Sequence, residues 1–403
     1  MTNKKVLLSA FSCDPFKGSE AACGWHWACG LAAKGYEVHV LTRATNRDPI
    51  ERHAAVPNLF FHYVSLPGLE FLYKVSQAGM YLYYLLWQWR AYRIAVRLHR
   101  QMKFDIAQHV SWGNFYCGSF LYRLPVPFLF GPAGSGQKAP PTFREYFLDG
   151  WAAEDKREKV ARFLLAFNPA CSEMIRKAKA VIVSNHETLE LVKQNGAKEI
   201  CFSLDAALSP DFFPAMFPER QYKKGTLKLL WIGRFLPRKG LPLVLEVMKE
   251  LRPFPEITLT IVGDGEIRAE VEKRVKAGSL EQSVRLVGSV PHQEVRSFYV
   301  AHDVFFFTSL RDSSPCQLIE AMAFGLPVVT LNLHGQAVIV SEQTGIKIPV
   351  DSPASVVKEL AKAIVALSRD KDRYAAMSRA AYEFAKQQTW KRKIEEITAL
   401  FYT

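Results

Sequence analysis

The sequence lacks several signatures that would assign it to common classes of protein. No G-x-G-x-x-G motif follows the first predicted strand, which disfavours a nicotinamide-dependent dehydrogenase, and no Walker A motif is present. The aromatic-rich stretch between Lys74 and Arg90 holds 15 residues without a charged side chain, among them Gln77 and Gln88. A membrane-spanning helix needs about 20 apolar residues, so the sequence predicts no transmembrane segment.

Paired cysteines and paired acidic residues are also scarce. The seven cysteines include no C-x-x-C pair, which argues against a disulfide framework and a structural zinc site, and favours a reducing compartment. The D-x-D triplet, Asp370-Lys-Asp372, lies in a charged helical stretch and not after a strand. We therefore predict no metal ion, no cofactor and a cytoplasmic location.

The chain is clearly basic. Its 403 residues carry 52 Lys and Arg against 39 Asp and Glu, a net charge of +13. Such a balance favours an anionic partner, which could be nucleic acid, an acidic membrane surface or a phosphate-bearing substrate. With 49% hydrophobic and 23% charged residues, the composition is that of a globular protein of two or three domains.

Short apolar runs alternate with longer amphipathic segments. In the second half, strands are predicted at Leu227–Ile232, Ile257–Val262, Val284–Val287, Val304–Thr308 and Val328–Leu331, with helices at Leu241–Leu251, Glu266–Ala277, Gln293–Ala301 and Gln317–Phe324. In the first half, strands are predicted at Val6–Ala10, Glu37–Leu41, Asp105–His109, Pro127–Phe130 and Ala180–Val183, with a helix at Glu20–Lys34. This alternation predicts the α/β class, with two doubly wound parallel sheets.

The domain boundaries are predicted from the same pattern. We expect an N-terminal Rossmann-like domain over 1–205, a proline-containing linker over 206–225 and a C-terminal Rossmann-like domain over 226–385. A C-terminal helix over 386–403 is expected to pack back on the N-terminal domain. Open parallel sheets bind ligands beyond the carboxyl ends of their strands, so functional residues are expected in the loops after strands.

The loop after Leu227–Ile232 is rich in glycine and in cations. It runs from Gly233 and Arg234 to Lys239 and Gly240, and then opens a helix. A helix N-terminus offers unpaired N–H groups, the guanidinium of Arg234 can grip phosphate oxygens, and Lys239 adds a point charge. The loop therefore suits a diphosphate, although a basic loop on a basic protein has the same residues.

Two carboxylates, Asp312 and Glu320, follow the strand Val304–Thr308. On one continuous helix, eight residues separate them by about 80°, so they could share a side of it. Paired carboxylates accept hydrogen bonds from the hydroxyls of sugars and ribose. The alternative is an acidic N-terminal cap at Asp312 and a surface glutamate at Glu320.

Three loops in the first half also follow strands. They contain Gly18, in Gly18-Ser-Glu; His109, at the end of its strand; and the glycines of Gly131-Pro-Ala-Gly134-Ser-Gly136. Each would face a cleft between the two domains. A single histidine is more often a satisfied structural residue, and glycine-rich turns after strands are common.

Taken together, these motifs resemble those of the retaining family-4 glycosyltransferases of the GT-B fold. In the second half the resemblance is carried by Gly233-Arg234-x4-Lys239-Gly240, Val262-Gly-Asp-Gly265, Val287-Gly288 and Glu320-Ala-Met-Ala-x-Gly325-x-Pro327-Val-Val. In the first half it is carried by Gly18-Ser-Glu-x3-Gly24-Trp25, Gly35-Tyr-Glu-Val-His-Val, Asp105-x3-His109 and Gly131-Pro-x-Gly-x-Gly136. The first half resembles a bacterial subgroup associated with surface polysaccharides such as lipopolysaccharide and capsule.

The resemblance implies two doubly wound Rossmann-like domains that face a central cleft. The N-terminal domain would bind the acceptor, and the C-terminal domain would bind a UDP- or GDP-linked sugar. The reaction implied is that of a hexosyltransferase-type, metal-independent glycosyltransferase. It would move the sugar to a hydroxyl of a lipid-linked or polysaccharide acceptor with retention of anomeric configuration.

The resemblance also implies roles for individual residues. Arg234 and Lys239 would bind the diphosphate and stabilise its departure, Asp312 would face the donor sugar, and His109 would lie beneath it. Asp312 stands where the family usually has Glu. The further donor contacts implied are Gly18 at the diphosphate, Glu320 at the ribose, Gly288 and Val290 near the base, and Cys316 and Gln317.

Segment 71–103 contains six Lys and Arg, eight aromatic residues and no Asp or Glu. Arg90, Arg93, Arg97 and Arg100 fall within about 80° of one another on a helix. This pattern predicts an interfacial helix in peripheral contact with anionic lipid on the inner face of the plasma membrane. The alternative is an ordinary helix on the N-terminal sheet, with the arginines on its solvent face.

Two other functions account for part of the sequence. A GT-B-like sugar-nucleotide epimerase would turn over without an acceptor. A nucleic-acid-binding protein would fit the net charge and the aromatic content, and would bind with steep salt dependence. The basic residues scatter over loops and helices and no nucleic-acid-binding module is recognised, so we expect no nucleic-acid partner.

Overall fold

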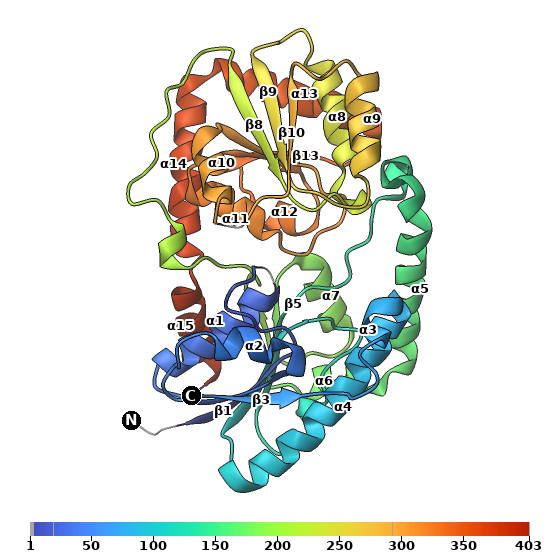
Figure 1. Ribbon diagram of the computed structural model, residues 1–403, viewed down its shortest axis with the longest axis vertical. Helices are drawn as coiled ribbons and strands as arrows, with labels where there is room; N and C mark the ends of the chain where they lie inside the picture. The colour runs from blue at the N-terminus through green and yellow to red at the C-terminus, as the bar shows by residue number, and fades with distance from the viewer. Residues whose placement is uncertain (1–3, 19, 292, 403) are drawn as a thin grey trace. The chain divides into compact units, whose positions relative to one another are not determined.

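A computed structural model describes residues 4–18, 20–291 and 293–402 (Figure 1). Ser19, the middle residue of the motif that begins at Gly18, lies outside these ranges. The chain divides into two compact units. The first unit comprises Met1–Gly136, Lys159–Ala206 and Trp390–Thr403, and the second comprises Gln137–Glu158 and Ala207–Thr389.

The first unit has a seven-stranded parallel sheet with the strand order β3-β2-β1-β4-β5-β6-β7. Its strands are β1 Lys5–Ala10, β2 Glu37–Arg43, β3 Leu59–Val64, β4 Ile106–Ser111, β5 Phe128–Ala133, β6 Ala180–Val183 and β7 Ile200–Phe202. Its helices are α1 Glu20–Ala33, α2 Arg47–Glu51, α3 Leu72–Val75, α4 Gln77–Met102, α6 Pro169–Lys177, α7 His186–Gln194 and α15 Trp390–Phe401. β4, β5 and β6 are buried at every residue, as expected of parallel strands covered on both faces.

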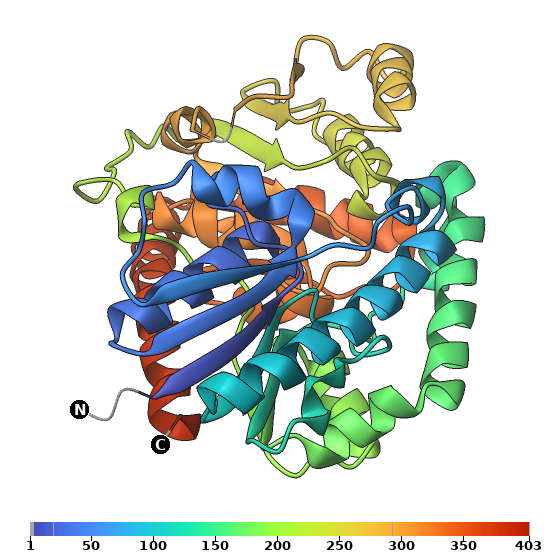
Figure 2. The ribbon, with the colours of Figure 1, turned by 60° about the horizontal axis from the view of Figure 1, so that its bottom comes forward.

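Helix α4 runs across one face of this sheet (Figure 2). It begins where the Ser76 hydroxyl accepts a hydrogen bond from the amide of Gly79 at 3.0 Å, and it ends at Lys103 in a left-handed conformation. Tyr84 and Trp87 are fully buried in the core beneath it. The helix is therefore anchored to the sheet by one apolar face.

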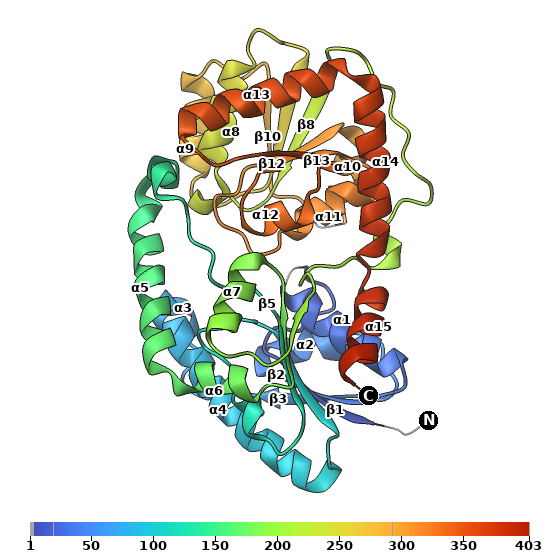
Figure 3. The same cartoon turned by 180° about the vertical axis from the view of Figure 1, so that it is seen from behind.

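The second unit has a six-stranded parallel sheet with the order β10-β9-β8-β11-β12-β13. Its strands are β8 Leu227–Ile232, β9 Ile257–Val262, β10 Val284–Gly288, β11 Val304–Phe307, β12 Val328–Leu331 and β13 Gly345–Ile348. Its helices are α8 Leu241–Glu250, α9 Arg268–Ala277, α10 Val295–Ala301, α11 Cys316–Ala323, α12 His334–Ile339, α13 Pro353–Arg369 and α14 Lys371–Gln387. α13 packs against α8, and α14 packs against α11 (Figure 3).

The predicted α/β class and the two doubly wound parallel sheets are confirmed. The predicted strands at Ala180–Val183, Leu227–Ile232, Ile257–Val262 and Val328–Leu331 agree residue for residue. These segments are short, mostly apolar runs that are largely buried in the sheet, and such runs are the clearest sequence signal for central parallel strands.

Two segments pack away from their neighbours in sequence. Segment 137–158 lies between β5 and β6 in the chain but packs in the second unit, whereas the sequence boundaries placed it in the first domain. Helix α15 packs in the first unit, where a Cβ added to Gly30 of α1 would come within 2.2 Å of Ile394. The domain boundaries drawn from the sequence remain a prediction, because packing alone does not define separately folding domains.

Among the helices in the part of the chain that the structure describes, none has the length and apolarity needed to cross a bilayer.

Candidate functional site

The strand order of the second unit locates a candidate site. β8 and β11 are neighbours at the centre of the sheet, and the order of strands reverses between them. Doubly wound sheets bind ligands beyond the carboxyl ends of their strands at such a point. The loops 233–240 and 308–315 follow these two strands, and they contain Arg234, Lys239 and Asp312.

The loop after β8 is pressed closely against the loop after β11. It ends in the short 3-10 helix Pro237–Lys239, and Gly240 follows with a φ of 68°. A Cβ at Gly240 would stand only 2.3 Å from the carbonyl oxygen of Thr308, so only glycine fits this turn. The close approach places the buried side chain of Lys239 beside the second loop.

Lys239 and Asp312 form an ion pair in which the Lys239 ammonium donates to Oδ2 of the carboxylate. Nη1 of Arg238 lies 3.5 Å from Oδ1 of the same carboxylate. Burial alone would raise the pKa of Asp312, but Lys239 and Arg238 hold this pKa below its ordinary value. Burial lowers the pKa of Lys239; the charge of Asp312 opposes this shift and that of Arg238 adds to it.

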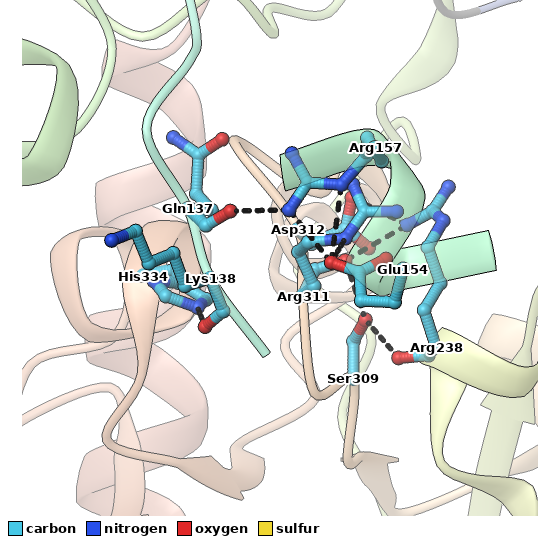
Figure 4. A network of polar contacts seen from close by, with 9 residues as sticks. All are labelled: Gln137, Lys138, Glu154, Arg157, Arg238, Ser309, Arg311, Asp312 and His334. Atoms are coloured by element: carbon cyan, nitrogen blue, oxygen red, sulfur yellow. Dashed lines mark hydrogen bonds and ion pairs between the residues drawn. The ribbon is translucent and has the colours of Figure 1, made fainter. Parts of the chain in front are cut away.

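The backbone of the Asp312 loop is also fixed. Nη1 of Arg238 donates to the carbonyl oxygen of Arg311 at 2.9 Å. The amide of Gly335 donates to the carbonyl oxygen of Asp312 at 3.2 Å. The Ser309 hydroxyl donates to the carbonyl oxygen of Arg238 at 3.2 Å (Figure 4). The position of Asp312 is therefore set by contacts from two sides.

A second carboxylate, that of the buried Glu154, lies in the same network. Glu154 belongs to α5, Trp151–Phe167, and accepts hydrogen bonds from Nη2 and Nε of Arg157 at 2.6 and 3.1 Å. Its Oε1 also lies 2.7 Å from Nε of Arg311 (Figure 4). Burial lowers the pKa of Arg311 to about 10; the charge of Arg157 adds to this shift and that of Glu154 opposes it.

We refer to these side chains as the cation cluster. Its cations and carboxylates are Arg157, Arg234, Arg238, Lys239 and Arg311, with Glu154 and Asp312. Five cations against two carboxylates leave three positive charges in excess. Arg234 is exposed, Arg157, Arg238 and Arg311 are half-buried, and Lys239 is buried. A partly buried excess of like charge is unfavourable unless an anion compensates it, so the cluster is suited to a polyanionic ligand.

Asp312 and Glu320 do not lie on one continuous helix, so they do not share a side of it in the way considered from their spacing, and Asp312 is not its N-cap. Helix α11 begins at Cys316 with Pro315 as the N-cap, and Asp312 lies in the preceding loop. Proline disfavours a helical conformation in the residue before it, which stops the helix from extending towards Asp312. Glu320 lies on α11, and one of its carboxylate oxygens accepts from the Tyr299 hydroxyl at 2.8 Å.

The other predicted donor contacts of the second unit lie at the ends of elements. Gly288 ends β10 with a φ of 91°, and its carbonyl oxygen accepts from the amide of Gly263 at 2.8 Å. Val290 is half-buried in the loop that follows. Cys316 and Gln317 form the first turn of α11.

Gly18 and His109 belong to the first unit. Gly18 is exposed in the loop after β1. His109 is fully buried in β4, where Nδ1 lies 3.0 Å from the Ser9 hydroxyl and Nε2 lies 3.0 Å from the Tyr84 hydroxyl. Burial lowers the pKa of His109 to about 4, so the imidazole is neutral near pH 7. Both ring nitrogens therefore have partners within the core of this unit.

Within the described ranges, no group of three or more His, Cys, Asp or Glu side chains is arranged to hold a metal ion. Metal independence remains a prediction.

Residues 213–384, which lie within the second unit, match the family model described as "Glycosyl transferases group 1". One component of the phosphatidylinositol N-acetylglucosaminyltransferase of Arabidopsis thaliana is 30% identical over 153 residues, which make up 37% of this chain and 34% of the relative. The chain thus spans about a third of the length of this curated relative.

Solved structures resemble the chain over nearly its full length. Sucrose-phosphate synthase from Thermosynechococcus elongatus matches with a TM-score of 0.69 and 18% identity, over 99% of this chain and 98% of that one. Anabaena HepE in complex with UDP matches with a TM-score of 0.62 and 16% identity, over 98% of this chain and 100% of that one. The fold is the GT-B fold, and its second unit has the sequence pattern of the glycosyl transferases group 1.

Proposed function

We propose that the protein is a retaining glycosyltransferase that takes a sugar from a nucleoside-diphosphate donor and transfers it to an acceptor hydroxyl. One observation carries the proposal: the segment that matches the glycosyl transferases group 1 contains the loops after β8 and β11, from which most of the cation cluster comes. A sugar nucleotide offers the polyanion that such a cluster needs.

The charges of the cluster suit the departure of a diphosphate. The bond between the anomeric carbon and the diphosphate oxygen breaks, and a bond from the acceptor oxygen to the same carbon forms. The acceptor proton passes to the departing diphosphate on the same face, which retains the configuration. Negative charge grows on the diphosphate as it leaves, and fixed cations that face it stabilise the transition state more than the ground state.

In this proposal Arg234 and Lys239 bind the diphosphate, and Asp312 faces the sugar. Lys239 pairs with Asp312, so a bound diphosphate shares the ammonium with that carboxylate. Glu320, on α11, accepts hydrogen bonds from the ribose. The remaining donor contacts follow the resemblance. The diphosphate is assigned to Gly18, the sugar to His109, the base to Gly288 and Val290, and further donor contacts to Cys316 and Gln317.

The donor and acceptor classes have separate support. The structural neighbour HepE is described with bound UDP, which favours a uridine nucleotide over a guanosine nucleotide. The name of the Arabidopsis relative describes transfer of N-acetylglucosamine to phosphatidylinositol, a lipid. We therefore propose a lipid-linked or polysaccharide acceptor, with no cofactor and no nucleic-acid partner.

Helix α4 supports a peripheral membrane contact on the cytoplasmic side. Its buried face holds Tyr84 and Trp87, so it packs as an ordinary helix of the first unit. Its exposed face carries Arg90, Arg93, Arg97 and Arg100 together with Leu82 and Trp89, each about half exposed. The guanidinium of Arg93 lies over the Trp89 ring at 4.9 Å. Cations beside exposed apolar side chains suit an anionic lipid surface.

The proposal is tested by a thermal-shift screen of UDP, GDP and their sugars, followed by an assay of nucleoside diphosphate release with a lipid-linked acceptor. A specific ligand stabilises the fold in proportion to the logarithm of its concentration over Kd, which identifies the base. Release that depends on the acceptor supports transfer. Turnover of the sugar nucleotide without any acceptor would support an epimerase, and no response to any nucleotide would refute the proposal.

A further inference from the structure

The cation cluster includes a segment that comes from the first half of the chain. Segment 137–158 packs in the second unit, where Phe143 and Phe147 are buried in the core. The Tyr146 hydroxyl donates to Glu246 of α8 at 2.6 Å. Gly150 lies so close to Pro237 that an added Cβ would be 2.8 Å from its ring. The segment is therefore fixed against the 3-10 helix Pro237–Lys239, which carries Lys239.

Glu154 is held firmly on this segment. Its side chain is 5% exposed, and the guanidinium of Arg157, one turn along α5, donates two hydrogen bonds to it. Arg157 is fixed in turn, because its Nη2 also donates to the carbonyl oxygen of Gln137 at 2.9 Å. A carboxylate with this support has a defined position from which to bind a further cation.

That further cation is Arg311, the residue before Asp312. Its Nε lies 2.7 Å from Oε1 of Glu154, and its charge interacts with the carboxylates of both Glu154 and Asp312. If Glu154 lost its charge, Asp312 would be the one carboxylate left in the cluster, facing five cations. Arg311 would then compete with Lys239 and Arg238 for Asp312.

We propose that Glu154 is a positioning residue of the donor site, which binds Arg311 and so keeps Asp312 paired with Lys239 and Arg238 in the orientation that faces the sugar. This inference rests on the proposed function for its kinetic consequence. The structural part of the inference is that Arg311 pairs with Glu154 and not with Asp312, and this part does not depend on the proposed function. In this scheme Glu154 acts through Arg311.

The kinetic test compares Glu154→Gln with Asp155→Asn, a matched loss of charge at the neighbouring exposed position of α5. We expect kcat of Glu154→Gln to fall by about tenfold or more, with the KM for the donor changed by less than about threefold, because Asp312 acts on the sugar at the reacting carbon. Asp155→Asn should behave as the wild type. A kcat for Glu154→Gln within about twofold of the wild type would overturn the inference.

The double variant Glu154→Gln/Arg311→Gln separates positioning from general stability. Removing Arg311 removes the competitor for Asp312, so we expect kcat of the double variant to exceed that of Glu154→Gln alone. Equal or lower kcat in the double variant contradicts the inference. Glu154→Asp, which keeps the charge on a shorter side chain, should give an intermediate kcat if Glu154→Gln does not fold.

A crystal structure of Glu154→Gln, or of Glu154→Asp, gives a readout that needs no activity. We expect the Arg311 guanidinium to turn towards Asp312 in Glu154→Gln and to keep its contact with the shorter carboxylate in Glu154→Asp. If the Arg311 guanidinium keeps its wild-type position in Glu154→Gln, the inference is overturned, whatever the activity of the variant. An inactive wild type would instead refute the proposed function, while the position of Arg311 would still decide this inference.

Discussion

Lys239 and Asp312 form a partly buried ion pair that joins the loop after β8 to the loop after β11 in the second unit. Lys239 is 5% exposed, and its ammonium lies 5.1 Å from the centre of the Phe307 ring. The pair places a cation and a carboxylate at the point where the strand order reverses, beside the other cations of the cluster. A diphosphate would therefore bind a positively charged region whose side chains are held by ion pairs and hydrogen bonds within the protein.

The first prediction concerns the two cations assigned to the diphosphate. Arg234→Ala and Lys239→Ala should each lower turnover by orders of magnitude, since one fixed donor to a developing anion contributes about 3–4 kcal/mol. Both variants should remain folded. Lys224→Ala, which removes an exposed cation of the same unit, is the control and should leave turnover unchanged. Steady-state kinetics with circular dichroism checks this, and near-normal turnover in both variants would refute the assignment.

The second prediction concerns Gly263, in the loop after β9. Its φ is 135°, and an added Cβ would lie 1.8 Å from the carbonyl oxygen of Gly233. Gly263→Ala should therefore lower the free energy of unfolding by more than about 3 kcal/mol. Gly225→Ala is the matched control, because Gly225 also has a positive φ of 80° but has open space around it. It should cost about 1 kcal/mol. Equal costs for the two variants in urea denaturation would contradict the described packing of this loop.

The third prediction concerns pH. The pKa of His109 is about 4 in the folded protein against an ordinary value of 6.5. The folded state therefore resists protonation of His109. The contribution of this residue to the free energy of unfolding, about 3 kcal/mol, is fully present above pH 6.5 and is lost as the pH falls towards 4. His109→Gln should reduce the decline in the free energy of unfolding between these pH values. Urea denaturation across the range measures it, and an identical decline in both proteins would contradict a buried neutral His109.

The fourth prediction concerns the exposed face of α4. The wild type should float with vesicles that contain anionic lipid and should not float with neutral vesicles, because the attraction is electrostatic. Replacement of its four arginines by glutamine should abolish flotation. The matched control replaces four exposed cations of α13 and α14: Lys358, Lys362, Lys371 and Arg373. A membrane contact through α4 would be rejected if neither the wild type nor the α4 variant floats with anionic vesicles, or if both float equally.

The sequence predicted the central strands well because burial on both faces leaves a plain apolar run, as in Val304–Phe307. It also placed Arg234, Lys239 and Asp312 in loops after strands, where the fold brings Lys239 and Asp312 together. It left open whether Asp312 shares a helix with Glu320 or caps it, and it did not identify Pro315 as the N-cap, which separates Asp312 from the helix of Glu320.

Glu154, Arg157 and Arg311 could not be found from the sequence for a different reason. Glu154 and Arg157 lie on α5, which follows a strand of the first sheet, so no local spacing connects them with Arg311. The contact forms only because segment 137–158 packs in the second unit. The aromatic residues Phe143, Tyr146 and Phe147 in that segment were the available signal, since they need a core to bury them.

In the proposed function, positive side chains of the second unit hold a nucleoside diphosphate without a metal ion. Isothermal titration calorimetry with UDP and with GDP, in the presence of excess EDTA, tests it most directly. We expect that one of the two binds to the wild type in EDTA and that its affinity falls sharply in Arg234→Ala and Lys239→Ala. Binding that requires a divalent cation, or binding that these two substitutions leave unchanged, would contradict it.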